Sequence, residues 1–224
     1  MALECVNGTA RAATAIGVLG GTFDPIHNGH LVIAEEARVR LQLDRVLFVP
    51  AQASPFKQQQ RTTSATHRCR MIELAIAGNP AFALSRVDLQ RPAPSYTVDT
   101  LRLLKREWGE GSQLYFIMGQ DAIAGLLAWR APAEIIRLAR LVLMRRPGYA
   151  PDIQYLEAQL PGLHESLIIL DSPELSVSST ELRWRVAMGW PIRYQVPDEV
   201  VRYIMAHHLY RDHDPAPVAA ELHP

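Results

Sequence analysis

Residues 15–30, AIGVLGGTFDPIHNGH, hold the strongest structural signal in this 224-residue chain. The apolar run at their start ends in Gly20 and Gly21, a pattern that predicts a β-strand turning into a helix. Two glycines after a strand let the backbone approach a ligand closely. His27 and His30, three positions apart at a helix start, can direct imidazole N–H groups at one anion. The stretch therefore predicts a phosphate-binding turn.

Similar short apolar runs recur along the chain, and segments with helical spacing separate them. The expected strands are 15–19, 45–49, 81–87, 114–118, 141–144 and 167–170. This alternation predicts the α/β class, with a Rossmann-like, doubly wound parallel sheet and helices on both of its faces. The last third is more helical, and we expect helices over 179–188 and 198–208. The C-terminal part is therefore predicted to be helical.

Composition narrows the classes of function. Lys and Arg together number 23, as do Asp and Glu, so the overall charge gives no case for binding nucleic acid or a membrane. No apolar run approaches the length of a membrane span. With two cysteines, the chain is not expected to depend on a disulfide scaffold, and the first fourteen residues do not resemble a secretory signal. We expect a cytoplasmic protein.

The chain is expected to form one domain with two extensions. Residues 1–14 form an N-terminal extension whose order the sequence leaves open. Residues 15–211 show no repeat, linker or change of composition, so they are read as a single domain. Residues 212–224 contain three prolines and little apolar periodicity, so we expect this C-terminal tail to be frayed.

Polar, aromatic and cationic residues follow most of the expected strands. In an open parallel sheet, ligands bind at the carboxyl ends of the strands. These residues are Lys57 after the second strand, Ser95, Tyr96 and Thr97 after the third, Gly119, Asp121, Trp129 and Arg130 after the fourth, and Ser178, Ser179, Thr180 and Arg183 after the sixth. Hydroxyls at a helix N-terminus can bind phosphate, and an arginine one turn later can add a charge-assisted contact.

Plainer interpretations of these residues remain open. Residues 178–180 can serve only as a helix N-cap, and Asp121 can cap the helix that follows Gly119. Trp129 can be a packing residue, and Lys57 a solvated surface charge. No carboxylate or cysteine cluster accompanies the two histidines, so no metal site built from protein ligands is expected. The P-loop, G-x-G-x-x-G and G-x-S-x-G motifs are absent, which disfavours P-loop kinases, dehydrogenases and Ser–His hydrolases.

Two motifs together resemble a known family. HNGH at 27–30 and SSTELR at 178–183 are similar to the H-x-G-H and S-S-T-x-[IL]-R motifs of a nucleotidyltransferase superfamily. GGTFDP at 20–25 and SYTVDT at 95–100 fit its bacterial nicotinate-nucleotide adenylyltransferases, and the resemblance covers roughly 15–211. Gln120 departs from the small residue that is usual at its position in the family.

The resemblance implies transfer of AMP from ATP to nicotinic acid mononucleotide, giving deamido-NAD and pyrophosphate in NAD biosynthesis. The acceptor phosphate would attack the α-phosphorus directly, without a covalent enzyme intermediate. Mg²⁺ would arrive with ATP and need few protein ligands. The partners are then ATP and nicotinic acid mononucleotide; no nucleic acid or membrane partner is expected, although a homo-oligomer stays possible.

The resemblance also implies a set of site residues. His27, His30 and Arg183 would be catalytic. The ATP-binding residues would be Gly20, Gly21, Thr22, Phe23, His27, His30, Lys57, Gly119, Asp121, Ser178, Ser179, Thr180 and Arg183. Tyr96, Thr97, Trp129 and Arg130 would bind the acceptor, with Trp129 stacking on the pyridine ring.

Two alternatives remain. The first keeps the chemistry but changes the acceptor to nicotinamide mononucleotide, phosphopantetheine or a substrate of cytidylyl transfer. The second is a nucleotide-binding sensor without turnover, which would not need His27, His30 and Arg183 together.

Overall fold

The computed structural model of the chain describes residues 14–52, 62–145, 150–173 and 175–211. The predictions for Lys57, for residues 1–13 and for the tail over 212–224 lie outside the described residues.

A parallel sheet of six strands, in the order β3-β2-β1-β4-β5-β6, forms the centre of the molecule. Each neighbouring pair of strands runs parallel. The strands are β1 (Ala15–Gly21), β2 (Arg45–Pro50), β3 (Phe82–Leu84), β4 (Gln113–Gly119), β5 (Ala139–Arg145) and β6 (Leu167–Asp171). The strand order reverses between β1 and β4, which is the switch point where doubly wound sheets bind ligands. The predicted fold class is confirmed.

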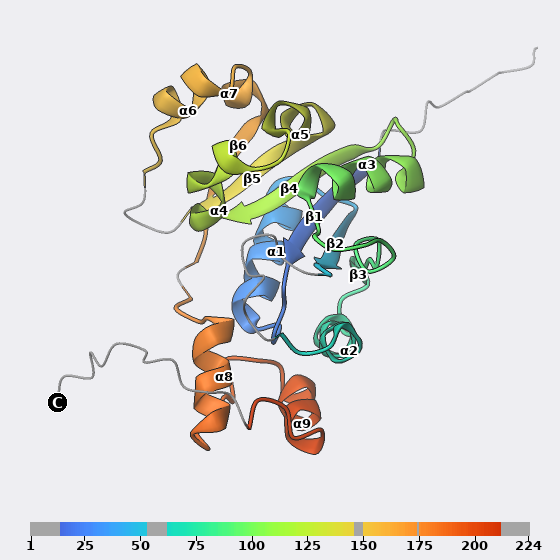
Figure 1. Cartoon of the computed structure of the whole chain (residues 1–224), viewed down its shortest axis with the longest axis vertical. Helices are drawn as coiled ribbons and strands as arrows, with labels where there is room; N and C mark the ends of the chain where they lie inside the picture. The colour runs from blue at the N-terminus through green and yellow to red at the C-terminus, as the bar shows by residue number, and fades with distance from the viewer. Residues whose placement is uncertain (1–13, 53–61, 146–149, 174, 212–224) are drawn as a thin grey trace, which may run out of the picture.

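Helices cover both faces of this sheet. They are α1 (Asn28–Arg40), α2 (Ala65–Ile76), α3 (Thr97–Trp108), α4 (Gln120–Ala124), the 3-10 helix η1 (Leu126–Ala128), α5 (Pro132–Leu138), α6 (Ile153–Gln159), α7 (Leu163–Ser166), α8 (Ser179–Ala187) and α9 (Asp198–Ala206). One hydrophobic core joins the sheet to α1, α2, α8 and α9, and a second joins the other face to α3, α4, α5, α6 and α7. Figure 1 shows α8 and α9 together at one end of the molecule, with α6 and α7 at the opposite end.

The sequence explains why these elements form. Strands buried on both faces need near-continuous apolar runs, and the stretch from Leu141 to Met144 in β5 is buried throughout. Helix α3 instead carries Val98, Leu101 and Leu104 at helical spacing, and all three are fully buried. Within the described chain, none of the helices combines the length and hydropathy that a transmembrane segment requires.

The third strand is shorter than predicted. The expected strand over 81–87 is present only as Phe82–Leu84, because this edge strand pairs with three residues of β2. The Ser85 N–H still donates to the Phe48 carbonyl at 3.0 Å, and the chain then leaves the sheet. The two predicted C-terminal helices are present and end within two residues of the expected positions.

Candidate active site

A cavity of about 670 Å³ lies at the carboxyl ends of the central strands. Its lining includes most of the predicted site residues: Gly20, Gly21, Thr22, His27, His30, Tyr96, Thr97, Gly119, Asp121, Trp129, Arg130, Ser178, Ser179 and Thr180. The fold therefore brings segments more than 150 residues apart in the sequence to one space.

The two histidines stack on each other at the start of α1. Their ring centroids are 3.7 Å apart with an interplanar angle of 27°. His27 is the N-cap residue, and its backbone N–H donates to Nδ1 of His30 at 3.2 Å. A ring nitrogen that accepts a hydrogen bond carries no proton, so a neutral His30 holds its proton on Nε2.

Burial controls the charge of His27. His27 is only 7% exposed, and this desolvation lowers the pKa of His27 from 6.5 to about 4. His27 is therefore a neutral imidazole at physiological pH. Its Nδ1 is buried against the start of α1.

Gly29 gives His27 its space. A Cβ at position 29 would lie 3.0 Å from Nδ1 of His27 and 3.1 Å from its Cε1, a distance that real Cβ atoms rarely show. The glycine of the H-x-G-H motif is thus explained by contact with the first histidine of the motif.

Phe23 supports the turn from behind. Its side chain is buried in the core, and a Cβ on Gly21 would lie 3.0 Å from the Phe23 ring. The ring packs edge-on against His30, with centroids 4.9 Å apart. The structure places Phe23 outside the residues that line the cavity, so its side chain shapes the turn.

Two buried charged residues fix the loop that follows the turn. Asp24 and Arg68 are each 2% exposed. One oxygen of the Asp24 carboxylate accepts from the Thr63 N–H at 3.0 Å, and the other accepts from the Tyr210 hydroxyl at 2.7 Å. Arg68 donates to the Thr22 and Thr63 carbonyls at 2.7 and 3.0 Å. Desolvation lowers the pKa of Arg68, whereas the charge of Asp24 opposes that effect.

Helix α8 starts at the cavity. Ser178 is its N-cap and accepts from the Glu181 N–H at 3.2 Å, so the capping interpretation of this serine is confirmed. Ser178 also lines the cavity. The Ser179 hydroxyl donates to the Pro25 carbonyl at 2.9 Å, which ties the helix to the loop after β1.

Arg183 lies one turn further along α8. Its Nη1 donates to the Asp24 carbonyl at 2.8 Å and its Nη2 contacts the Thr180 hydroxyl at 3.4 Å. Among the described residues that line the cavity, Arg183 is absent, although Thr180 is present. The structure therefore places this guanidinium beside the site, against the loop that follows β1.

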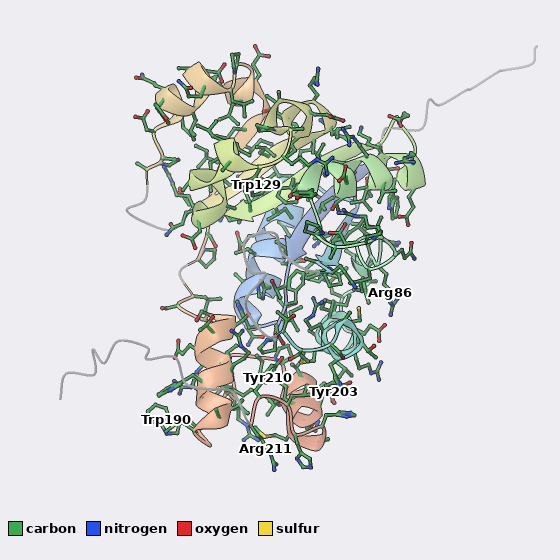
Figure 2. The ribbon with its side chains drawn as sticks, viewed as in Figure 1. Arg86, Trp129, Trp190, Tyr203, Tyr210 and Arg211 are labelled. Atoms are coloured by element: carbon green, nitrogen blue, oxygen red, sulfur yellow. The ribbon has the colours of Figure 1, made fainter. Side chains whose placement is uncertain are left out.

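Tyr96, Trp129 and Arg130 form one wall of the cavity, here named the Trp129 wall. Trp129 packs edge-on against Phe116 with centroids 5.9 Å apart. The Arg130 guanidinium lies 4.8 Å from the centre of the Tyr96 ring, and its Nη1 is 3.5 Å from the Asp99 carboxylate. Figure 2 shows Trp129 well separated from Tyr203 and Tyr210, which lie near α9.

Sequence reasoning missed several residues that line the cavity, including Asp88, Thr100 and Ser172. Thr100 carried a detectable signal, since it is a polar residue on the apolar side of the segment that contains Val98, Leu101 and Leu104. Asp88 carried one too, because it is the first residue after the expected strand over 81–87. Among the described residues, no three His, Cys, Asp or Glu side chains gather as a metal site.

Comparison with known proteins identifies the family. Residues 18–185 match the model of the cytidylyltransferase-like family. A probable nicotinate-nucleotide adenylyltransferase of Roseiflexus sp. (strain RS-1) is 52% identical over 200 residues, which are 89% of this chain and 100% of that protein. The chain belongs to the nicotinate-nucleotide adenylyltransferase family.

A more distant member of the nicotinate-nucleotide adenylyltransferase family has the same breadth of match. The probable enzyme of Dehalococcoides mccartyi (strain ATCC BAA-2266 / KCTC 15142 / 195) is 45% identical over 195 residues, covering 87% of this chain and 96% of that protein. The resemblance read from the two motifs is thus confirmed, and the chain is an enzyme of the nucleotidyltransferase class.

Solved structures agree with the fold. Plasmodium falciparum nicotinic acid mononucleotide adenylyltransferase, solved as complexes with APC and with NaAD, has a TM-score of 0.71 and 20% identity. The match covers 88% of this chain and 98% of that chain. At this identity the likeness shows a common fold.

Proposed function

We propose that this enzyme transfers AMP from ATP to nicotinic acid mononucleotide, giving deamido-NAD and pyrophosphate in NAD biosynthesis. The observation that carries the proposal is the single cavity shared by the H-x-G-H turn, the start of α8 and the Trp129 wall. The full-length match to proteins named probable nicotinate-nucleotide adenylyltransferases supports the same acceptor.

The reaction is a direct displacement. The phosphate of the acceptor is already an anion, so it needs alignment with the α-phosphorus and neutralisation of charge more than a general base. The bond from that phosphate oxygen to the α-phosphorus forms as the bond to the pyrophosphate oxygen breaks. No covalent enzyme intermediate is required.

His27 and His30 act as hydrogen-bond donors to the ATP phosphates. Because His27 is neutral, it contributes an N–H group without a formal charge at physiological pH. Donors held in place before the reaction stabilise developing charge without the cost of reorganisation. The stacking of the two rings and the hydrogen bond from the His27 N–H to His30 supply that fixed geometry.

The start of α8 holds the rest of the triphosphate. The hydroxyls of Ser178, Ser179 and Thr180 lie at a helix N-terminus, where N–H groups and the helix dipole favour anions. Arg183 then favours the departing pyrophosphate, and Lys57 adds a further phosphate contact. Gly20, Gly21, Thr22, Gly119 and Asp121 complete the ATP side of the cavity.

Mg²⁺ enters with ATP in this proposal. Its usual ligands in such sites are phosphate oxygens and water, with one or two carboxylates at most. The bound ion would neutralise phosphate charge.

The acceptor binds against the wall of the cavity that contains Tyr96, Trp129 and Arg130. The Trp129 ring stacks on the pyridine ring, while Tyr96 and Thr97 at the start of α3 and the Arg130 cation favour an anionic group.

The test is to supply Mg-ATP with nicotinic acid mononucleotide, nicotinamide mononucleotide and phosphopantetheine separately, and to measure pyrophosphate release. CTP in place of ATP serves as the control for the transferred nucleotide. We expect the nicotinic acid form with ATP to give the largest kcat/KM. No turnover with it, or a clearly larger kcat/KM with another acceptor, would overturn the assignment.

A further inference from the structure

Three polar side chains, two of them buried and one partly buried, form a cluster beside the residues proposed to bind the acceptor. Asp88, Arg91 and Thr100, here named the Asp88 cluster, join the segment after β3 to the first turn of α3. Asp88 is 5% exposed and Thr100 is 4% exposed. Asp88 and Thr100 also touch the cavity, whereas Arg91 lies outside its lining.

Asp88 holds the Arg91 guanidinium in one orientation. Nη2 and Nε of Arg91 donate to the same Asp88 oxygen at 2.7 and 3.2 Å. That oxygen also accepts from the Thr100 hydroxyl at 2.6 Å. The Thr100 hydroxyl oxygen accepts from Nη2 of Arg91 at 3.0 Å, so each member contacts the other two.

Arg91 reaches the backbone that begins α3. Its Nη2 donates to the Tyr96 carbonyl at 3.1 Å. The same carbonyl accepts the backbone N–H groups of Asp99 and Thr100, each at 3.1 Å, which form the first turn of the helix. Arg91 therefore fixes the position of Tyr96 and of Thr97, which follows it.

The segment from Arg91 to Tyr96 has no strand or helix of its own to fix it. Its second anchor is the Ser95 hydroxyl, which accepts from the Gln52 N–H at 2.9 Å after β2. An irregular segment depends on such side-chain bonds for its shape, because its backbone groups lack the partners of regular structure.

Charge gives the cluster a second consequence. Asp88 places a carboxylate at the cavity, and the proposed acceptor is anionic. The Arg91 cation compensates that carboxylate at 2.7 Å. Without Arg91, a buried uncompensated carboxylate would repel the acceptor as well as release the Tyr96 carbonyl.

We infer that Arg91 is a positioning residue for the acceptor: with Asp88 and Thr100 it holds Tyr96 and Thr97 in the shape that receives the pyridine nucleotide. The inference rests on the proposed function. A buried ion pair contributes little net stability compared with apolar packing, so stability alone is a weak reason for this cluster to lie at the cavity.

The test compares Arg91→Met, Arg91→Lys and Thr100→Val with the wild type. The KM for the acceptor, the KM for ATP, kcat and the midpoint of urea unfolding are measured for each protein. Arg91→Met should raise the acceptor KM by about tenfold or more and leave the ATP KM within about twofold. Arg91→Lys should restore part of this loss, because it keeps the charge but not the forked contacts.

Arg202→Met is the matched control. Arg202 lies on α9 and pairs with the Glu199 carboxylate three residues before it, as Arg91 pairs with Asp88, and neither Arg202 nor Glu199 is among the described residues that line the cavity. Both KM values should stay unchanged in this variant. Thr100→Val keeps the shape of threonine and should also raise the acceptor KM. This variant tests the inference if Arg91→Met does not fold.

Equal changes in both KM values, or unchanged KM values with a lower unfolding midpoint, would overturn the inference. Failure of the proposed function would show differently, as the wild type preferring another acceptor. The variants are then measured with that acceptor, and a rise in its KM alone would still support the role of Arg91.

Discussion

Individual residues in this site owe their chemistry to their surroundings. His27 is neutral because the protein removes it from water, and Gly29 is a glycine because the His27 ring occupies the space where a Cβ would lie. The sequence could predict that His27, Gly29 and His30 act together. It could not predict the support from Arg68, since that buried arginine bonds to the Thr22 carbonyl, 46 residues away in the sequence.

The lowered pKa of His27 makes folding stability depend on pH. The unfolded chain binds a proton at His27 near pH 6.5, whereas the folded protein resists it until about pH 4. Stability from this group is therefore fully present above pH 6.5 and is lost as the pH falls toward 4, by about 3 kcal/mol. Urea unfolding of the wild type and of His27→Gln between pH 8 and 4 measures this.

The difference between the two proteins isolates His27 from the other groups that titrate in this range. The wild type should lose more stability on acidification than His27→Gln. Parallel curves for the two proteins would show that the folded pKa of His27 is not lowered.

Gly29→Ala tests the space around His27. The new Cβ would lie 3.0 Å from Nδ1 of His27 and displace the ring, so kcat should fall by about tenfold or more. Gly78→Ala is the control, because a Cβ at that position meets nothing within 4 Å. Steady-state rates for both variants decide the point, and an equal, small effect of the two substitutions would contradict the role of Gly29.

At the scale of elements, α8, the loop between α8 and α9 and the segment after α9 hold the turn after β1 and the start of α1. Asn28 donates from Nδ2 to the Tyr194 carbonyl at 2.6 Å, and its N–H donates to the Gln195 carbonyl at 2.9 Å. The Ser179 hydroxyl and the Tyr210 hydroxyl contact the same loop, at Pro25 and Asp24. The helices were predictable from periodicity and start signals. Their attachment was not, because it depends on backbone carbonyls that any residue could supply.

Tyr210→Phe tests this attachment. Burial, followed by the charge of Asp24, raises the pKa of Tyr210, so its hydroxyl stays protonated and donates to the buried carboxylate. Loss of that donor should lower the free energy of unfolding by about 1–3 kcal/mol. Tyr155→Phe, at a residue that is 57% exposed on α6, should leave it unchanged. Equal unfolding midpoints for the two variants would show that the Asp24 contact is not needed.

At the scale of the whole molecule, the site residues come together at the carboxyl ends of the central strands. The sequence could predict a parallel sheet, since its strands are apolar runs buried on both faces. The predicted Rossmann-like class has the first strand beside the fourth, and that neighbour relation creates the switch point where the cavity lies. The early end of β3 was beyond prediction, because pairing with β2 sets it.

The central claim is that this cavity transfers AMP and that His27 stabilises the transfer. Its most direct test is the initial rate of pyrophosphate release from Mg-ATP and nicotinic acid mononucleotide, measured for the wild type and His27→Ala. A circular dichroism spectrum of the variant shows that the fold is kept. We predict that kcat falls by about 10²–10³-fold in the variant. A folded His27→Ala enzyme with a rate close to that of the wild type would contradict the account.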